Sequence, residues 1–236
     1  NEERWLKRAY GGDILRPKFS ILDPETTYTL PPYQTSCGAA DMMMHTMERY
    51  FTTETPMEIT DNLSIALLKT VMKNARIALD KPNDYNARAE LMWASSLAHN
   101  GLTGCGGIGD WSTHDMEHEL GGMFDIAHGA GLAAVWSSWA RYVYKVKPSR
   151  FAKFAKDLFG IDEANDEVSA LAGIKAMEDF YHSINMPASV GEMDIHLTDE
   201  QIEELAHKGT DGGTKTMGSF KKIAKEDLKN IFTMAR

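Results

Sequence analysis

The feature that most constrains this sequence is a helical period that begins shortly after Pro31-Pro32 and continues to the C-terminus. Apolar residues recur at the spacing of an α-helix, as in residues 61–79, where Leu63, Leu67 and Val71 share one face. Helices are therefore expected over residues 36–51, 61–79, 84–102, 111–124, 129–144, 150–159, 163–184, 199–207 and 225–235. Thr198 and Gln201 form a capping box before the eighth of them. The pattern predicts an all-α chain.

The N-terminal segment predicts the one exception to this helical pattern. Residues 18–22 alternate between polar and apolar side chains and end at Asp23-Pro24, which is a turn signal. Residues 26–32 are expected to be extended or irregular, because Pro31-Pro32 disfavours a helix there. We therefore expect one short N-terminal strand beside the helices.

Composition and charge exclude several classes of function. Of the 236 residues, 43% are hydrophobic and 25% are charged, as is typical of a globular chain. No stretch approaches the roughly 18 apolar residues of a membrane span. The net charge of −9, without a basic stripe, argues against nucleic acid as a partner. Two cysteines, Cys37 and Cys105, are too few for a disulfide scaffold and suit a reducing, cytoplasmic compartment. The chain opens on Asn1 in mid-pattern, which suggests a piece of a longer protein.

A glycine-rich run at residues 104–109 formally matches the G-x-G-x-x-G pattern of dinucleotide-binding proteins. That pattern binds a pyrophosphate only as a strand-to-helix turn inside a βαβ unit. Here a helical pattern precedes the run and no second strand follows. We expect a turn between two helices, in which glycines supply unusual backbone angles.

Two clusters of residues have the spacing of metal ligands. Asp41 and His45 are four residues apart and therefore share one helix face. His114 and His118 have the same spacing, and His128 follows 14 residues after His114, which is close to four helical turns. Three histidines within fifteen residues favour a metal site. His99, His182, His196 and His207 have no such neighbours in sequence and are expected at the surface or at helix ends.

The residues alone leave two other interpretations open. His114-Asp-Met-Glu117-His118 spells H-x-x-E-H, the pattern of a zinc metallopeptidase with two histidine ligands and a glutamate base. That interpretation leaves Asp41, His45 and His128 without a role. A metal-free helical module, in which the histidines only satisfy hydrogen bonds, is the third possibility.

Three separated motifs carry a resemblance to a known family. Residues 22–32 (LDPETTYTLPP), 38–50 (GAADMMMHTMERY) and 110–120 (DWSTHDMEHEL) resemble iron-containing alcohol dehydrogenases, most closely their NAD(P)H-dependent butanol dehydrogenase branch. The likeness extends through Asn185-Met-Pro187 to residues 217–222 and covers essentially the whole chain. It implies the multi-helical C-terminal domain of the dehydroquinate synthase-like fold. Residues 33–236 would be the helical metal-binding catalytic domain, and residues 1–32 a strand and linker from a nucleotide-binding domain.

The resemblance also implies roles for individual residues. The metal ligands would be Asp41, His45, His114 and His128. His118 would be a catalytic histidine beside the nicotinamide and the substrate, without binding the metal. The remaining cofactor contacts would be Lys7, near the ribose, and Thr29 and Leu30, in the linker that closes over the nicotinamide.

The activity implied is hydride transfer between NAD(P)H and a small aliphatic aldehyde or alcohol, with Fe²⁺ or Zn²⁺ as Lewis acid. The intact enzyme would be a homodimer. Family members begin with a domain that carries a Gly-Gly-Gly-Ser pyrophosphate loop, and this sequence contains no such loop. We therefore expect the chain alone to be inactive.

Overall fold

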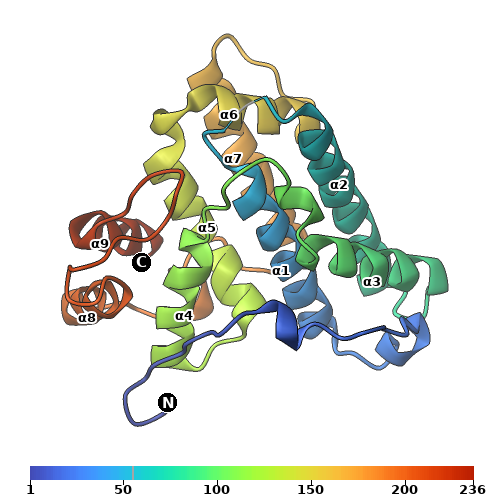
Figure 1. Ribbon diagram of the computed structural model, residues 1–236, viewed down its shortest axis with the longest axis horizontal. Helices are drawn as coiled ribbons and strands as arrows, with labels where there is room; N and C mark the ends of the chain where they lie inside the picture. Colours follow the sequence, from blue (N-terminus) through green and yellow to red (C-terminus); the bar gives the residue numbers. More distant parts are fainter. Residues whose placement is uncertain (55) are drawn as a thin grey trace.

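The computed structural model describes residues 1–54 and 56–236, and in these residues the regular structure is helical (Figure 1). The all-α prediction is therefore confirmed. The α-helices are α1 (Pro32–Tyr50), α2 (Glu58–Asp80), α3 (Tyr85–His99), α4 (Ser112–Phe124), α5 (His128–Val143), α6 (Pro148–Phe154), α7 (Asp166–Ser183), α8 (Asp199–Gly209) and α9 (Lys225–Ala235). One π-helical turn (Ala155–Phe159) continues α6, and short 3₁₀ turns include η1 (Asp13–Leu15), η2 (Pro24–Thr27) and η3 (Leu102–Gly104).

The predicted N-terminal strand is wrong. Residues 18–22 have no regular structure, and Phe19 and Ile21 are exposed. A lone strand leaves its backbone donors and acceptors unpaired, and no second strand lies beside this segment in the described part of the chain. Alternation over five residues was a local signal without the partner that a strand needs.

The first long helix begins four residues earlier than predicted. Pro32 is the first residue of α1, where a proline loses nothing because its missing N–H has no partner in the first turn anyway. The capping box of α8 forms as predicted: the Thr198 hydroxyl accepts from the Gln201 N–H, and the Gln201 side chain accepts from the Thr198 N–H.

Helix α1 runs through the middle of the molecule and packs against α2, α3 and α5 (Figure 1). Thirteen of the sixteen residues of α5 are buried, so α1 and α5 together form the centre of the core. They approach so closely that a Cβ on Gly129 would lie 2.0 Å from the carbonyl oxygen of Cys37. This contact places the first turn of α5 directly against the middle of α1.

Aromatic side chains fill the core behind that contact. The rings of Phe51, Trp136, Trp139, Phe151 and Phe154 are all buried and contact one another. They hold the C-terminal end of α1 against α5 and α6, which fixes the helices that carry the chemistry described below.

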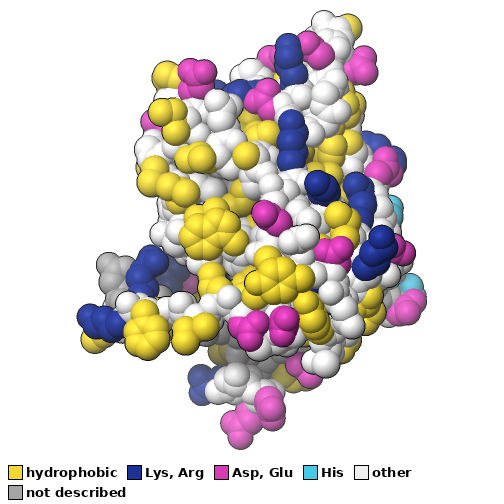
Figure 2. All heavy atoms as spheres, turned by 90° about the vertical axis from the view of Figure 1, so that its right-hand side faces the viewer, with side chains coloured by type: hydrophobic (Ala, Val, Ile, Leu, Met, Phe, Trp, Pro, Cys, Tyr) yellow, Lys and Arg dark blue, Asp and Glu magenta, His cyan; other side chains and the backbone are white. Residues whose placement is uncertain are grey.

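The outer face of α2 and α3 is more mixed. Figure 2 shows this side of the molecule, where hydrophobic side chains lie among charged ones, and Ile59, Leu63, Tyr85 and Trp93 are exposed on these two helices. Among the described residues, no helix is both long enough and apolar enough to cross a membrane.

Candidate metal centre

The four residues predicted as metal ligands come together from three helices. Asp41 and His45 lie one turn apart on α1, His114 lies in the first turn of α4, and His128 is the first residue of α5. The Nε2 atoms of His45, His114 and His128 lie 3.7, 3.7 and 3.4 Å from Oδ1 of Asp41. The break between α4 and α5, at residues 125–127, lets His128 turn back toward His114.

These donor atoms have the spacing and the chemistry that a cation requires. Oδ1 of Asp41 and Nε2 of His114 are buried and have no hydrogen-bond partner. Tetrahedral ligands at about 2.1 Å from a metal lie about 3.4 Å from one another. The separations of Asp41 Oδ1 from the three Nε2 atoms are close to this value, and ligand atoms of Asp41, His114 and His128 all lie within 4.8 Å of one another. Buried polar atoms without partners are costly, and a shared cation would satisfy them. The residues present therefore fit a divalent metal.

Glu48 fixes the orientation of His114. Its buried carboxylate accepts a short hydrogen bond from Nδ1 of His114 and accepts from the backbone N–H groups of Thr113 (2.7 Å) and His114 (3.1 Å). Trp111, which precedes α4, has a left-handed backbone (φ 64°) and offers no side-chain cap, so Glu48 of α1 caps this helix. With Nδ1 donating to Glu48, the lone pair of Nε2 faces the centre.

Glu117 plays the same part for His128. Its carboxylate is fully buried, contacts Nδ1 of His128 closely, and accepts from the Lys7 ammonium at 2.8 and 3.0 Å. A Cβ on Gly131 would lie 2.8 Å from the Glu117 side chain, so the glycine makes room for it. A hydrogen bond from Nδ1 to Glu117 again leaves Nε2 free to bind a cation.

Ionisation at the centre follows from these contacts. Burial opposes ionisation of Asp41, but His114, His128 and His99 outweigh it and lower the pKa of Asp41 below its usual range. Burial also disfavours the charged form of His114, yet Asp41 and Glu48 raise its pKa to about 9. Burial, together with His114 and His99, lowers the pKa of His45 to about 3.

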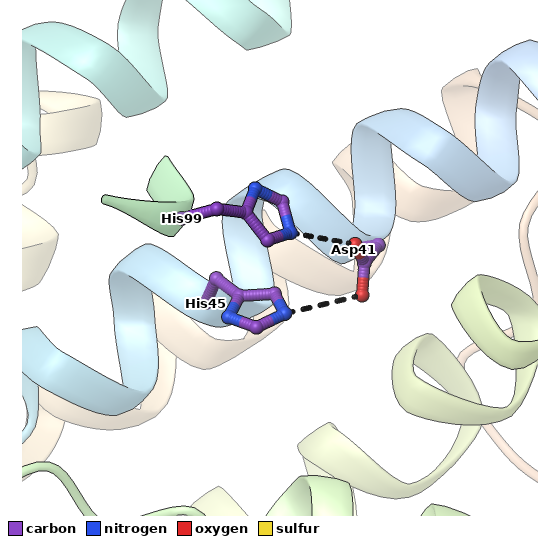
Figure 3. Close-up of side chains that lie close together, drawn as sticks. All are labelled: Asp41, His45 and His99. Carbon is purple, nitrogen blue, oxygen red and sulfur yellow. Dashed lines mark hydrogen bonds and ion pairs between the residues drawn. The ribbon is translucent and has the colours of Figure 1, made fainter. Parts of the chain in front are cut away.

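His99 belongs to this cluster, although the sequence predicted a helix-end residue without partners. It does end α3, but its Nε2 lies 3.2 Å from Oδ2 of Asp41 and its ring centre lies 4.0 Å from that of His45 (Figure 3). Nothing in the local sequence indicates this contact, because 58 positions separate His99 from Asp41.

The residues predicted to contact the cofactor lie around the centre. His118 is half-buried and stacks on His128, with ring centres 5.8 Å apart. Burial, with Lys7 and His128 among further causes, lowers the pKa of His118 to about 4. Lys7 and His118 line one polar cavity of about 410 Å³. Thr29 and Leu30 are exposed in the turn after η2, and Leu30 lines a second cavity, of about 430 Å³, that also contacts His99.

The other patterns in the sequence have structural explanations. Residues 104–109 connect η3 to α4 and follow a helix, as the sequence predicted. Glu117 of the H-x-x-E-H pattern is bonded to Lys7 and His128. The ring centres of His114 and His118 are 6.5 Å apart, and no candidate cation site among the described residues contains both. The metallopeptidase interpretation therefore has no support.

Comparison with known proteins shows which family the chain belongs to. Residues 35–236 match the C-terminal part of the Fe-containing alcohol dehydrogenase family. Over 234 residues the chain is 39% identical to NADH-dependent butanol dehydrogenase A of Clostridium acetobutylicum, covering 98% of this chain and 60% of that protein. It is 32% identical to the NADPH-dependent aldehyde reductase YqhD of Escherichia coli, covering 98% of this chain and 59% of that protein.

Solved structures share the fold. The crystal structure of Escherichia coli YqhD superposes with a TM-score of 0.94 at 31% identity, covering 100% of this chain and 60% of that one. NADH-dependent butanol dehydrogenase A of Thermotoga maritima gives a TM-score of 0.92 at 34% identity, with the same coverage.

Fold and site define an all-helical structure in which side chains from three helices fit a divalent metal. The chain belongs to the iron-containing alcohol dehydrogenase family, of which it matches the C-terminal part. It spans about 60% of the length of the relatives it matches.

Proposed function

We propose that this chain is the metal-binding part of an NAD(P)H-dependent alcohol dehydrogenase or aldehyde reductase. The observation that carries the proposal is the convergence of three imidazole Nε2 atoms on one carboxylate oxygen, with two of the buried donor atoms lacking any other partner. The names of its relatives, butanol dehydrogenases and an aldehyde reductase, support small aliphatic alcohols and aldehydes as the substrates.

The proposed ligands are Asp41, His45, His114 and His128. One carboxylate and three imidazoles suit Fe²⁺ and Zn²⁺ alike. When bound, the cation would supply Lewis acidity toward a carbonyl or alcohol oxygen, and NAD(P)H would supply the hydride. Glu48 and Glu117 hold His114 and His128 with Nε2 toward the centre, so these two ligands are in place before the cation arrives.

His118 is the proposed catalytic residue that does not bind the metal. With a pKa lowered to about 4, its imidazole is neutral at neutral pH and can accept a proton or orient the nicotinamide. It lies beside His128 and opens on the polar cavity that Lys7 also lines. We propose Lys7, Thr29 and Leu30 as further cofactor contacts. Because Lys7 already donates a hydrogen bond to Glu117, it would contact both Glu117 and the cofactor.

We propose that residues 33–236 form the catalytic domain and that residues 1–32 link it to a nucleotide-binding domain. The greater length of the relatives supports this division. The cofactor's pyrophosphate would then be held outside this chain, and the chain alone would be inactive. A homodimeric intact enzyme and a cytoplasmic location stay predictions from the resemblance and from cysteine usage.

Metal binding by the purified, untagged chain tests the proposal. We expect one Fe²⁺ or Zn²⁺ per chain by elemental analysis, and Asp41→Ala or His45→Ala to abolish binding. His118→Ala is the matched control within the cluster and should still bind one ion. A metallopeptidase would show the reverse, because its ligands would include His118 and exclude Asp41 and His45. A chain that binds no ion would overturn the proposed centre.

A further inference from the structure

His99 extends the cluster beyond the four proposed ligands, and its contact with Asp41 divides the two oxygens of that carboxylate. Oδ1 faces the three Nε2 atoms of His45, His114 and His128. Oδ2 instead faces Nε2 of His99, at 3.2 Å (Figure 3). The other ring nitrogen of His99, Nδ1, lies 2.7 Å from the carbonyl oxygen of Ser95, one turn back on α3. Both ring nitrogens of His99 therefore face acceptor oxygens.

We infer that His99 is a positioning residue for Asp41, an inference that rests on the proposed metal centre. A carboxylate can bind a cation through one oxygen or through both. The hydrogen bond to His99 engages Oδ2, so Asp41 presents only Oδ1 to the centre. It also opposes rotation of the carboxylate away from the three imidazoles, which reduces the ordering required when a cation binds.

A second cation held by Asp41, His45 and His99 is the competing explanation, since one donor atom from each of the three residues lies within 4.8 Å of the others. Charge argues against it. Asp41 would be the only carboxylate serving both cations, and the guanidinium of Arg49 lies nearby, donating to the backbone carbonyls of His45 and Ala98. A second dication would face this positive charge without a carboxylate of its own.

The surroundings of His99 permit a clean substitution. His99 lies against a cavity of about 430 Å³ whose lining includes Leu30, Met42 and Met92. A leucine at position 99 has apolar neighbours there and fits the helical backbone of α3, so we expect His99→Leu to fold. His182→Leu is the matched control, because His182 is an exposed histidine near the end of α7 that pairs with Glu192.

Metal release from the 236-residue chain provides the test. The chain is loaded with Co²⁺, and transfer of the ion to excess EDTA is followed through the visible absorption of the bound cobalt. We expect one ion per chain in every variant and release about 10-fold faster from His99→Leu than from the wild type. The Co²⁺ bands of His99→Leu should also change, because Asp41 can then bind through both oxygens. His182→Leu should match the wild type in rate and spectrum, and His99→Gln, which keeps an amide donor, should fall between.

The outcomes separate this inference from the proposed function. One ion per chain with unchanged release and an unchanged spectrum in His99→Leu would overturn the positioning role and leave the centre itself intact. Two ions in the wild type and one in His99→Leu would also overturn it, because His99 would then be a ligand of a second cation. No ion in the wild type would overturn the centre on which the inference rests.

Discussion

Glu48→Gln separates the charge of the Glu48 carboxylate from its shape. The carboxylate accepts from three donors: the backbone N–H groups of Thr113 and His114, through Oε1, and Nδ1 of His114, through Oε2. A glutamine can keep its oxygen on the two backbone donors, but its NH₂ group then faces Nδ1 of His114. Two donors cannot share that contact, so His114 must move its proton to Nε2, where the cation would bind.

The expected loss follows from these contacts. Substitution of a residue that orients a metal-binding histidine costs about 10- to 100-fold in metal affinity, or about 1.4–2.7 kcal/mol. The metal-free chain should also lose about 1 kcal/mol of unfolding free energy, because a buried negative charge no longer faces the N-terminus of α4. The two effects are separable, since only the first depends on the metal.

Competition titration with a chromogenic zinc chelator measures the affinity, and urea unfolding of the metal-free chain measures the stability. Glu178→Gln is the matched control, because Glu178 pairs with Arg141 on the partly exposed side of α7, away from the centre. It should leave the affinity unchanged and cost less than about 1 kcal/mol. An affinity of Glu48→Gln within about twofold of the wild type would refute the role of Glu48 in fixing the tautomer of His114.

Two further substitutions test the packing and the electrostatics around the centre. Gly129→Ala would place a Cβ 2.0 Å from a backbone oxygen of α1 and should lower the unfolding free energy by about 1–3 kcal/mol in urea titrations. Gly38→Ala is the control on α1: its added Cβ would have no neighbour within 4 Å, so the substitution should be neutral or stabilising. Asp115 reaches the surface, but partial desolvation by the surrounding protein, with Glu48 next, raises its pKa to about 6 from the ordinary 3.8. The folded state therefore binds this proton more tightly, and stability falls as the pH rises between those values. Asp115→Asn should therefore raise Tm at pH values above about 7. The gain in unfolding free energy should be below about 1 kcal/mol, because the side chain is exposed, and it should disappear near pH 4. An equal gain at both pH values would contradict the raised pKa of Asp115.

Most of the helices could be predicted because their apolar residues recur at the helical period in the sequence, although α5 is buried on nearly every side. The errors came where a local pattern lacked its tertiary partner. Residues 18–22 alternate as a strand does, yet no strand lies beside them among the described residues. Pro32 was taken to exclude a helix, although the first turn of a helix tolerates proline.

Helical spacing predicted two clusters of candidate ligands, and only the family resemblance singled out Asp41, His45, His114 and His128. The i, i+4 rule placed Asp41 and His45 on one face of α1, and the structure brings His114 and His128 to them. Glu48 was missed because its contact with His114 spans 66 positions and no sequence motif links the two. Glu117 was visible only as the base of a peptidase pattern, whereas its partners are Lys7 and His128.

Charge explains why these particular groups surround the centre. The charged side chains that contact the four proposed ligands, within the described ranges, include the carboxylates of Glu48 and Glu117 and the ammonium of Lys7, which neutralises one of them. With Asp41 there are three negative charges, against the positive charges of Lys7 and of Arg49, which donates to the carbonyl of His45, so the sum is −1 once the imidazoles are neutral. One divalent cation already exceeds this negative charge, and a second would be uncompensated in a partly buried site. The same balance explains why His99 should position Asp41 instead of recruiting another metal: a hydrogen bond from its ring engages Oδ2 without adding a second dication.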